Sequence, residues 1–338
     1  MSNKIKIGLM GFGRVGRNLF RLGYNNPNLE FVVISDLGRA ETLRYLLVRD
    51  SVHGPLGVEA DIQNNYLNVE NQSVRLLPGG KPSEIPWDLI DVDVMIDTTG
   101  VSWPEEEFEA YRKFSKQTII TNPDISFVDR IIVPGVNGSD ISLDDKIISP
   151  SSSTTQVLAL MLKILDSEFS VKNAMMATVH AYTSDQPLAD NTQANRRRSR
   201  SAVENIIPNE TPSTRLVEAL YPHLKGKVSG TAFNVPVADG SCVDLTTEHE
   251  SLPSAEEVNE VMKTWAEGSL SGIVAYTEDP IVSRDVIGRG ESLVFDAKAT
   301  MIAADHFLKT ICWYDNGWGY SKRILEIVES YSELGGKN

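Results

Sequence analysis

The chain has few cysteines, no long apolar run and a deficit of positive charge. Only Cys242 and Cys312 occur among 338 residues, which excludes a disulfide framework and a cysteine-rich metal site, and we expect no metal. No apolar run reaches the roughly 18–20 residues of a membrane span. The 32 basic residues face 46 acidic ones, a net charge of −14 that repels nucleic acid and anionic membranes. We therefore expect a reducing, cytoplasmic compartment, and neither nucleic acid nor membrane as a partner.

The composition is that of a folded protein, with 41% hydrophobic and 23% charged residues. At roughly 150 residues per domain, this length predicts two domains. Residues 1–6 enter a strand-like alternation at once, so we expect no signal peptide. One basic run, Arg196–Arg200, interrupts the acidic charge. Such a run is typical of a solvated loop, and a site for an anionic ligand or a neighbouring subunit is the alternative.

The first half alternates short β-branched runs with helical patterns, which predicts βαβ units around a parallel sheet. The expected strands are Lys4–Leu9, Phe31–Ser35, Val92–Asp97, Gln117–Thr121, Arg130–Pro134 and Lys146–Ser149. The expected helices are Arg14–Tyr24, Ala40–Val48 and Glu105–Phe114. This half is therefore predicted to be an α/β domain.

The second half predicts an α+β domain built on one large, mostly antiparallel sheet. Ser153–Leu165 is apolar nearly all round and should be a buried helix. Ser254 and Glu257 form a capping-box pattern before a second helix. The expected strands are Asn173–Thr183, Ser229–Pro236, Ser241–His249, Ile273–Thr277, Glu291–Asp296 and Phe307–Tyr314. The predicted domains are residues 1–152, with a C-terminal helix at 317–338 packing back on them, and residues 153–316.

A glycine-rich loop follows the first predicted strand and opens the first helix. Its six residues have the G-x-G-x-x-G spacing: Gly11, Phe12, Gly13, Arg14, Val15 and Gly16. Gly11 permits a tight turn, Gly13 lets the backbone approach a pyrophosphate, and Gly16 lets helix and strand pack closely. The helix N-terminus supplies free N–H groups to the phosphates. Together with the βαβ pattern, this spacing predicts that the first half is a Rossmann-type dinucleotide-binding domain.

Asp36 ends the second predicted strand, twenty residues after Gly16. A carboxylate there accepts hydrogen bonds from the adenine ribose hydroxyls and would repel a 2′-phosphate, so it favours NAD as the cofactor. The following Gly38-Arg39 pair weakens that preference and leaves NADP open. A glycine-rich turn followed by a solvated aspartate is the competing interpretation.

Ordered motifs occur along the whole chain, at Gly11–Arg17, Asp50–Gly54, Thr98–Val101, Thr178–Thr183, Ile206–Pro208, Gly272–Glu278, Trp313–Asn316 and Gly319–Ser321. Together these motifs resemble the glyceraldehyde-3-phosphate dehydrogenase family. The resemblance implies an NAD-binding domain, a catalytic domain, a homotetramer, and phosphorylating oxidation of an aldehyde through a thioester. It also implies that Thr99, Gly100 and Asn316 line the nicotinamide end of the cofactor.

The nucleophile segment departs from the family, because Ser153 occupies the position of the catalytic cysteine. A serine hydroxyl is far less acidic than a thiol and needs a base held by another group. His180 matches the family's base, but the sequence shows no residue that would orient it. The alternatives are that Ser153 and Gln156 only form a capping box, and that His180 is a hydrogen-bonded core histidine.

The positions that bind phosphate in the family also carry different residues in this chain. In the family an arginine occurs where this chain has Asn234, and a glycine occurs where it has Pro212, which lacks a backbone N–H. The resemblance places six residues around substrate or phosphate: Ser152, Thr154, Thr183, Arg200, Thr211 and Asn234.

Two hypotheses follow from these losses. In the first, the chain keeps the fold and nucleotide binding, lacks normal activity, and has a regulatory or scaffolding role, mixed in assembly with an active paralogue. In the second, it is an enzyme that transfers hydride directly to or from a different carbonyl substrate, with His180 moving the proton and no thioester.

Overall fold

The computed structural model describes residues 4–122, 126–251, 253–304 and 306–335. Two compact units divide the chain, one of residues 1–152 and 321–338 and the other of residues 153–320. Residues 1–3 and 336–338, at the ends of the predicted first domain and C-terminal helix, lie outside the described residues. Every helix among the described residues is too short or too polar to span a bilayer.

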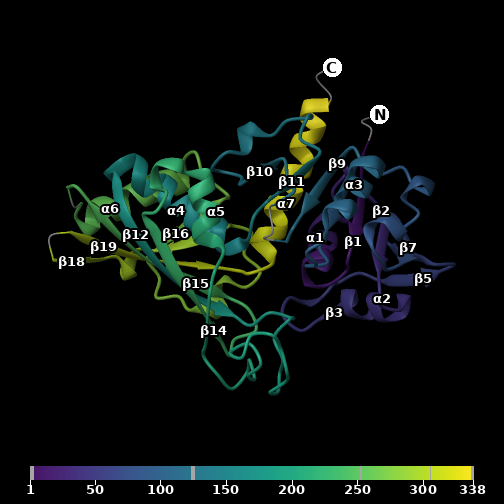
Figure 1. The fold of residues 1–338 in the computed structure, drawn as a ribbon, viewed down its shortest axis with the longest axis horizontal. Coiled ribbons are helices and arrows are strands. Elements are labelled where there is room, and N and C mark those ends of the chain that lie inside the picture. Colours follow the sequence, from purple (N-terminus) through teal and green to yellow (C-terminus); the bar gives the residue numbers. More distant parts are fainter. Residues whose placement is uncertain (1–3, 123–125, 252, 305, 336–338) are drawn as a thin grey trace. The chain divides into compact units, whose positions relative to one another are not determined.

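Nine strands of the first unit form one sheet in the order β10-β11-β9-β8-β1-β2-β7-β6-β5 (Figure 1). Pairing is parallel from β10 to β7 and antiparallel through β6 and β5. This confirms the predicted α/β fold. The strands are β1 (Ile5–Met10), β2 (Leu29–Asp36), β5 (Ala60–Gln63), β6 (Tyr66–Val69), β7 (Gln72–Pro78), β8 (Val94–Asp97), β9 (Gln117–Ile120), β10 (Arg130–Ile131) and β11 (Ile147–Ser149).

The helices of this unit connect and cover the parallel strands. Helix α7 packs beside α1, where the Asn26 side-chain amide donates to Glu329 at 2.8 Å. The helices are α1 (Arg14–Gly23), α2 (Ala40–Val48), α3 (Glu105–Phe114) and α7 (Trp318–Gly335), with a short β3–β4 pair (Arg49–Asp50, Gly54–Pro55) after α2. One buried cluster packs behind the ends of β1 and β8: Met10, Val33, Ile85, Trp87, Val92, Met95, Phe108, Tyr111, Ile120 and Ile147.

The second unit is built on an eight-stranded sheet in the order β13-β14-β12-β15-β19-β17-β16, with β18 paired to β19. The β12–β14 and β16–β17 pairs are parallel and the others are antiparallel. The strands are β12 (Val171–Ala181), β13 (Ile207–Asn209), β14 (Val228–Val235), β15 (Ser241–His249), β16 (Val274–Thr277), β17 (Leu293–Asp296), β18 (Met301–Ala303) and β19 (Phe307–Tyr314).

Helix α4 (Ser153–Phe169) packs against β12 and β15, with α5 (Ser213–Leu220) and α6 (Ala255–Glu267) beside it. Its residues Thr154 to Leu162 are all buried, which confirms the predicted buried helix. The capping box of α6 is also confirmed, since Ser254 Oγ accepts from the Glu257 backbone N–H at 3.2 Å and Glu257 accepts from the Ser254 N–H at 2.8 Å.

The structure differs from the sequence-based expectation in several places, and the short strands β3, β4, β13 and β18 were not predicted. The β5–β6–β7 hairpins were not predicted, although Asn64 and Asn65 adopt the positive φ of a tight turn (48° and 63°). Helix α5 was not predicted either. Strand β10 ends at Ile131 instead of Pro134, because the Asn137 side chain accepts from the Val133 N–H at 2.8 Å and turns the chain away from the sheet.

His249 links the end of β15 to the end of α4 and should make stability depend on pH. Its Nδ1 lies 3.0 Å from the Phe169 carbonyl oxygen and its Nε2 lies 2.8 Å from Thr247 Oγ1. Burial lowers the pKa of His249 below its ordinary value. The folded chain therefore binds this proton less readily than the unfolded chain, and stability falls as pH drops below about 6.5.

We expect the thermal midpoint of His249→Gln to fall less between pH 7 and pH 5 than that of the parent. The difference in unfolding free energy grows by at most about 1.4 kcal/mol per pH unit. Exposed His306 offers the control, since His306→Gln should reproduce the parent profile. Identical profiles for His249→Gln and the parent would contradict the assignment.

Candidate functional site

The three glycines of the first loop meet three different steric demands. Gly11 has φ +87°, which L side chains rarely adopt. A Cβ on Gly16 would lie 2.5 Å from the Gly11 carbonyl oxygen, so only glycine allows this contact. A Cβ on Gly13 would meet no atom within 4 Å, and Gly13 lines an open cavity at the start of α1. The loop thus leaves backbone exposed where a phosphate could approach the helix N-terminus.

Asp36 ends β2 beside this loop. One carboxylate oxygen accepts from the Phe12 N–H at 2.6 Å, and the other accepts from the Gly38 N–H at 2.7 Å. These two bonds fix the carboxylate at the mouth of the cavity. The remaining lone pairs can accept hydrogen bonds from ribose hydroxyls.

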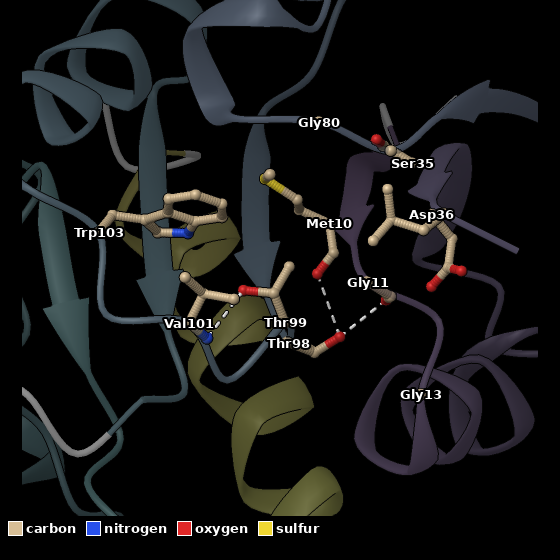
Figure 2. Close-up of a pocket in the computed structure, with 12 residues that line it drawn as sticks. Met10, Gly11, Gly13, Ser35, Asp36, Gly80, Thr98, Thr99, Val101 and Trp103 are labelled. Atoms are coloured by element: carbon tan, nitrogen blue, oxygen red, sulfur yellow. Dashed lines mark hydrogen bonds between the residues drawn. The ribbon is translucent and has the colours of Figure 1, made fainter. Parts of the chain in front are cut away.

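A cavity of about 250 Å³ lies at the carboxyl ends of β1, β2 and β8 (Figure 2). In open parallel sheets, ligands bind at this edge, where the strand order reverses. Of the predicted cofactor residues, Gly11, Gly13, Asp36 and Thr99 come together here. The full lining is Met10, Gly11, Gly13, Ser35, Asp36, Leu37, Gly79, Gly80, Thr98, Thr99, Val101 and Trp103.

Sequence reasoning missed a buried polar group behind this cavity. Asp97 ends β8 and is 2% exposed. Its carboxylate accepts from Thr99 N–H and O–H at 2.8 and 2.6 Å, from Trp103 Nε1 at 2.8 Å and from Tyr111 O–H at 2.8 Å. Burial raises the pKa of Asp97, and the hydrogen bonds act in the opposite direction. An acidic residue one position before Thr98-Thr99-Gly100 was the available signal.

In the second unit, His180 lies near the end of β12. Its Nδ1 donates to the Ala181 carbonyl oxygen at 2.6 Å, which leaves the lone pair on Nε2. The Asn316 amide donates to Nε2 at 3.0 Å, and Ser241 Oγ donates to the Asn316 side-chain oxygen at 2.8 Å. A carbonyl oxygen and an amide therefore orient this imidazole, the role for which the sequence showed no residue.

Tyr314 joins the His180 region to the first turn of α4. Its hydroxyl lies 2.8 Å from Thr154 Oγ1 and 3.1 Å from Thr178 Oγ1, and its ring meets the His180 ring edge-on at 6.3 Å. Burial raises the pKa of Tyr314 to about 12, so the hydroxyl stays neutral. Ser153 precedes Thr154 and is the first residue of α4.

The predicted capping box at Ser153 is one residue out of register. Because α4 begins at Ser153, the N-cap position belongs to Ser152. Gln156 is then one residue beyond the position that a capping box requires.

Asn234 lies opposite His180 in the parallel β12–β14 pair and is 6% exposed. Its side-chain oxygen accepts from the Asn209 amide, and its own amide donates to the Ala181 carbonyl oxygen at 3.4 Å. A neutral amide network thus occupies the place for which the resemblance implied an arginine. Asn209, on β13, was not predicted.

The other predicted phosphate residues already have protein partners. The Thr183 hydroxyl donates to Asp185, which also pairs with Arg198. Arg200 pairs with Asp190 at 3.0 Å. The Thr211 hydroxyl donates to Ser213 at 3.1 Å, at the start of α5. Two arginines of the basic run are therefore paired with nearby carboxylates. Arg196 and Arg197 are exposed.

Neither cysteine stands where it could serve as a nucleophile. Cys242 pairs with Val179 and Trp313 in the middle of the large sheet, and burial raises the pKa of its thiol to about 11. Cys312 is 1% exposed with its sulfur 3.1 Å from Met161 Sδ, and burial raises the pKa of this thiol as well. A reactive cysteine needs a lowered pKa, which both thiols lack, and it needs access, which the buried Cys312 lacks as well.

The fold and the first-unit site define a two-domain protein with a dinucleotide-binding α/β domain. Residues 5–104 match the family described as "Glyceraldehyde 3-phosphate dehydrogenase, NAD binding domain", and residues 152–316 match its "C-terminal domain". The chain belongs to the glyceraldehyde-3-phosphate dehydrogenase family and has its NAD-binding oxidoreductase fold.

Relatives align with almost the whole chain. The glyceraldehyde-3-phosphate dehydrogenase of Geobacillus stearothermophilus is 39% identical over 334 residues, covering 98% of this chain and 99% of the relative. Glyceraldehyde-3-phosphate dehydrogenase 1 of Bacillus cereus is 38% identical over 331 residues, with the same two coverages. The enzyme of Streptomyces coelicolor is 37% identical over 327 residues, covering 96% of this chain and 97% of the relative.

Proposed function

We propose that this chain binds NAD in its first unit and has lost, or strongly reduced, the phosphorylating aldehyde oxidation implied by its family. The observation that carries the proposal is Ser153 at the start of α4, in the position of the family's cysteine. Cys242 and Cys312 offer no substitute, since both are held in the large sheet with raised pKa values. A hydroxyl in place of a thiolate weakens attack on an aldehyde and yields an ester that phosphate cleaves less readily than a thioester.

The residues of the first unit fit a dinucleotide. Gly13 leaves open space at the start of α1, and Asp36 presents fixed carboxylate oxygens at the mouth of the cavity. When bound, NAD supplies a hydride acceptor. The Asp36 carboxylate disfavours a 2′-phosphate, so we propose NAD as the preferred cofactor, with NADP as the comparison that tests the choice.

The residues at the predicted phosphate positions also support the loss of phosphorylating activity. Asn234 is held by Asn209 and the Ala181 carbonyl oxygen, and it offers no charge to a phosphate. Pro212 has no N–H to donate. Binding a phosphate here would remove its hydration without the bidentate, charged hydrogen bonds of an arginine. A chain that keeps only the fold and the cofactor site would have a regulatory or scaffolding role.

A second candidate function is direct hydride transfer on a different carbonyl compound. The hydrogen bonds of His180 favour it, because Nδ1–H is fixed on Ala181, so Nε2, which accepts from the Asn316 amide in the free protein, is the nitrogen that would take up or return a proton. This reaction requires no thiolate. Asn316 and Ser241 would then hold the imidazole in one orientation.

Two measurements separate these functions. Calorimetry should show the purified chain binding NAD more tightly than NADP, while glyceraldehyde 3-phosphate, NAD and phosphate give negligible NADH. A screen of aldehydes and hydroxy compounds with both cofactors tests the second candidate, with His180→Ala as its control. Turnover that disappears in His180→Ala would establish direct transfer, whereas family-like oxidation of glyceraldehyde 3-phosphate would refute the loss of activity.

The oligomeric state is a prediction that rests on the family resemblance. Met175 and Val179 lie on β12 and are 66% and 37% exposed, so this face of the large sheet keeps apolar side chains for a partner. We propose a homotetramer, and a tetramer mixed with an active paralogue is the alternative. The mass of the purified protein in light scattering tests the first statement.

A further inference from the structure

Two arginines on helix α1, one turn apart, hold the β3–β4 hairpin. The Arg21 guanidinium donates to the Leu47 carbonyl oxygen just before the hairpin at 2.6 Å, and to the Gly54 carbonyl oxygen within it at 2.9 Å. Arg17 reaches the same hairpin through an ion pair with Asp50, in which nitrogen and oxygen are 3.4 Å apart. The first turn of α1 belongs to the glycine-rich loop, so the hairpin and the loop share one support.

Asp50 is a fixed anion in this hairpin. One of its carboxylate oxygens accepts from the backbone N–H groups of Val52 and His53 at 2.9 and 3.0 Å, and the other pairs with Arg17. Burial acts to raise the pKa of Asp50, but the hydrogen bonds from His53 and Val52 and the charge of Arg17 outweigh it and hold the pKa well below its ordinary value. The carboxylate is therefore charged at neutral pH, and it holds Arg17 in place.

Arg17 connects this anchor to the glycine-rich loop. Its side chain is 15% exposed, and its guanidinium donates to the Phe12 carbonyl oxygen at 3.2 Å. Because a trans peptide points its C=O and N–H in opposite directions, this bond directs the Gly13 N–H away from Arg17. Gly13 lines the cavity. The contact thus fixes the direction of an N–H group at the start of α1, where a phosphate would approach.

Asp36 holds the same loop residue from its other side. The Phe12 N–H donates to the Asp36 carboxylate at 2.6 Å. The Phe12 ring is buried and meets the Phe20 ring edge-on at 6.0 Å, so the residue is also fixed by packing. One line of polar contacts therefore runs from Asp50 through Arg17 and Phe12 to Asp36.

We propose that Arg17 and Asp50 are positioning residues of the dinucleotide site and set its preference for NAD over NADP. The proposal rests on the dinucleotide binding proposed above. Without the guanidinium, the Phe12–Gly13 peptide can rotate, because its carbonyl oxygen has lost this donor. Asp36 then loses a fixed N–H partner, so its charge no longer stands at one place against a 2′-phosphate.

The test measures the NAD and NADP affinities of the full chain by calorimetry, with the thermal midpoint recorded for each variant. Arg17→Gln should weaken NAD binding by about 10-fold, the loss expected for one charged hydrogen bond, while NADP binding changes less. The ratio of the two affinities should therefore fall. Asp50→Asn keeps the shape of the anchor without its charge, so it should lower the ratio by a smaller factor. Arg17→Lys keeps the charge without the planar fork and should restore part of the NAD affinity.

A double variant distinguishes positioning from a general loosening of the fold. In an Asp36→Asn background the carboxylate is already gone, so adding Arg17→Gln should leave the ratio of NAD to NADP affinity unchanged. Arg21→Gln is the matched control, because Arg21 holds the same hairpin from the same helix through backbone carbonyl oxygens. It should lower the thermal midpoint and leave the ratio unchanged.

A parent chain that binds neither NAD nor NADP would overturn the proposed function and the positioning role together. If the parent binds NAD but Arg17→Gln binds both cofactors as the parent does, only the positioning role is overturned. A ratio that falls equally in Arg21→Gln, or that falls further when Arg17→Gln is added to Asp36→Asn, would also overturn it. If Arg17→Gln does not fold, Arg17→Lys provides the test, and its ratio should lie below that of the parent.

Discussion

Ser153→Cys combined with Asn234→Arg should give this chain measurable oxidation of glyceraldehyde 3-phosphate, where the parent shows almost none. The first change puts a thiol at the start of α4, where the helix N-terminus favours the thiolate. The second provides a guanidinium opposite His180, where a neutral amide now stands. We expect a rate on the order of 100-fold above the parent for the pair, still below that of a family enzyme.

The single variants separate the two contributions. Ser153→Cys alone should be alkylated faster by iodoacetamide than the parent, yet oxidise the substrate slowly. Ser152→Cys, with a thiol one residue away, is the matched control and should show no rescue. Full activity from Ser153→Cys alone would mean that Asn234 and Pro212 matter little. An acyl adduct on Ser153 of the parent, detected by mass spectrometry, would contradict the loss of covalent chemistry.

Gly13→Ala should remove NAD binding while leaving the fold intact. Gly13 has an ordinary φ of −70°, and its new Cβ would meet no atom within 4 Å, so the substitution introduces no strain in the free protein. The methyl group would instead occupy the space where a pyrophosphate approaches the N-terminus of α1. We expect calorimetric affinity for NAD to fall by about 100-fold, because the phosphates lose contact with the backbone N–H groups.

Gly16→Ala should show the opposite pattern and serves as the comparison. Its Cβ would lie 2.5 Å from the Gly11 carbonyl oxygen and 3.0 Å from Thr98 Oγ1, so helix and strand must separate. We expect the unfolding free energy to fall by about 1–3 kcal/mol, seen as a lower thermal midpoint. A lower midpoint for Gly13→Ala, or unchanged NAD affinity in that variant, would argue against a phosphate site at Gly13.

Local patterns predicted local structure well. Helices α2 and α3 and strands β15 and β19 have the predicted bounds, because hydrophobic periodicity and strand-forming residues act over a few neighbours. The pattern failed at the β5–β6–β7 hairpins, where short strands of mixed polarity follow one another. The Asn64-Asn65 pair, whose residues adopt positive φ in the structure, is the turn signal in the sequence that could have found them.

The candidate site likewise has parts that the sequence predicted and parts that it did not. The glycine loop and Asp36 follow from residue type and spacing, whereas Ser153 in the position of a catalytic cysteine is an inference from the family resemblance. The partners of His180 could not be predicted, since Asn316 lies 136 residues further along the chain. Trp103 is near Asp97 in sequence, but its place on the cavity wall depends on β1, β2 and β7.

By itself, the sequence determined that a dinucleotide loop is present and that sulfur is missing at the start of α4. The tertiary structure alone decided that Asn209 and Asn234 hold each other, that an amide and a carbonyl orient His180, and that an indole lines the same cavity as Asp36. The physical reason is that sheet register and strand order bring together side chains from distant segments, and these distances are set by packing of the whole unit.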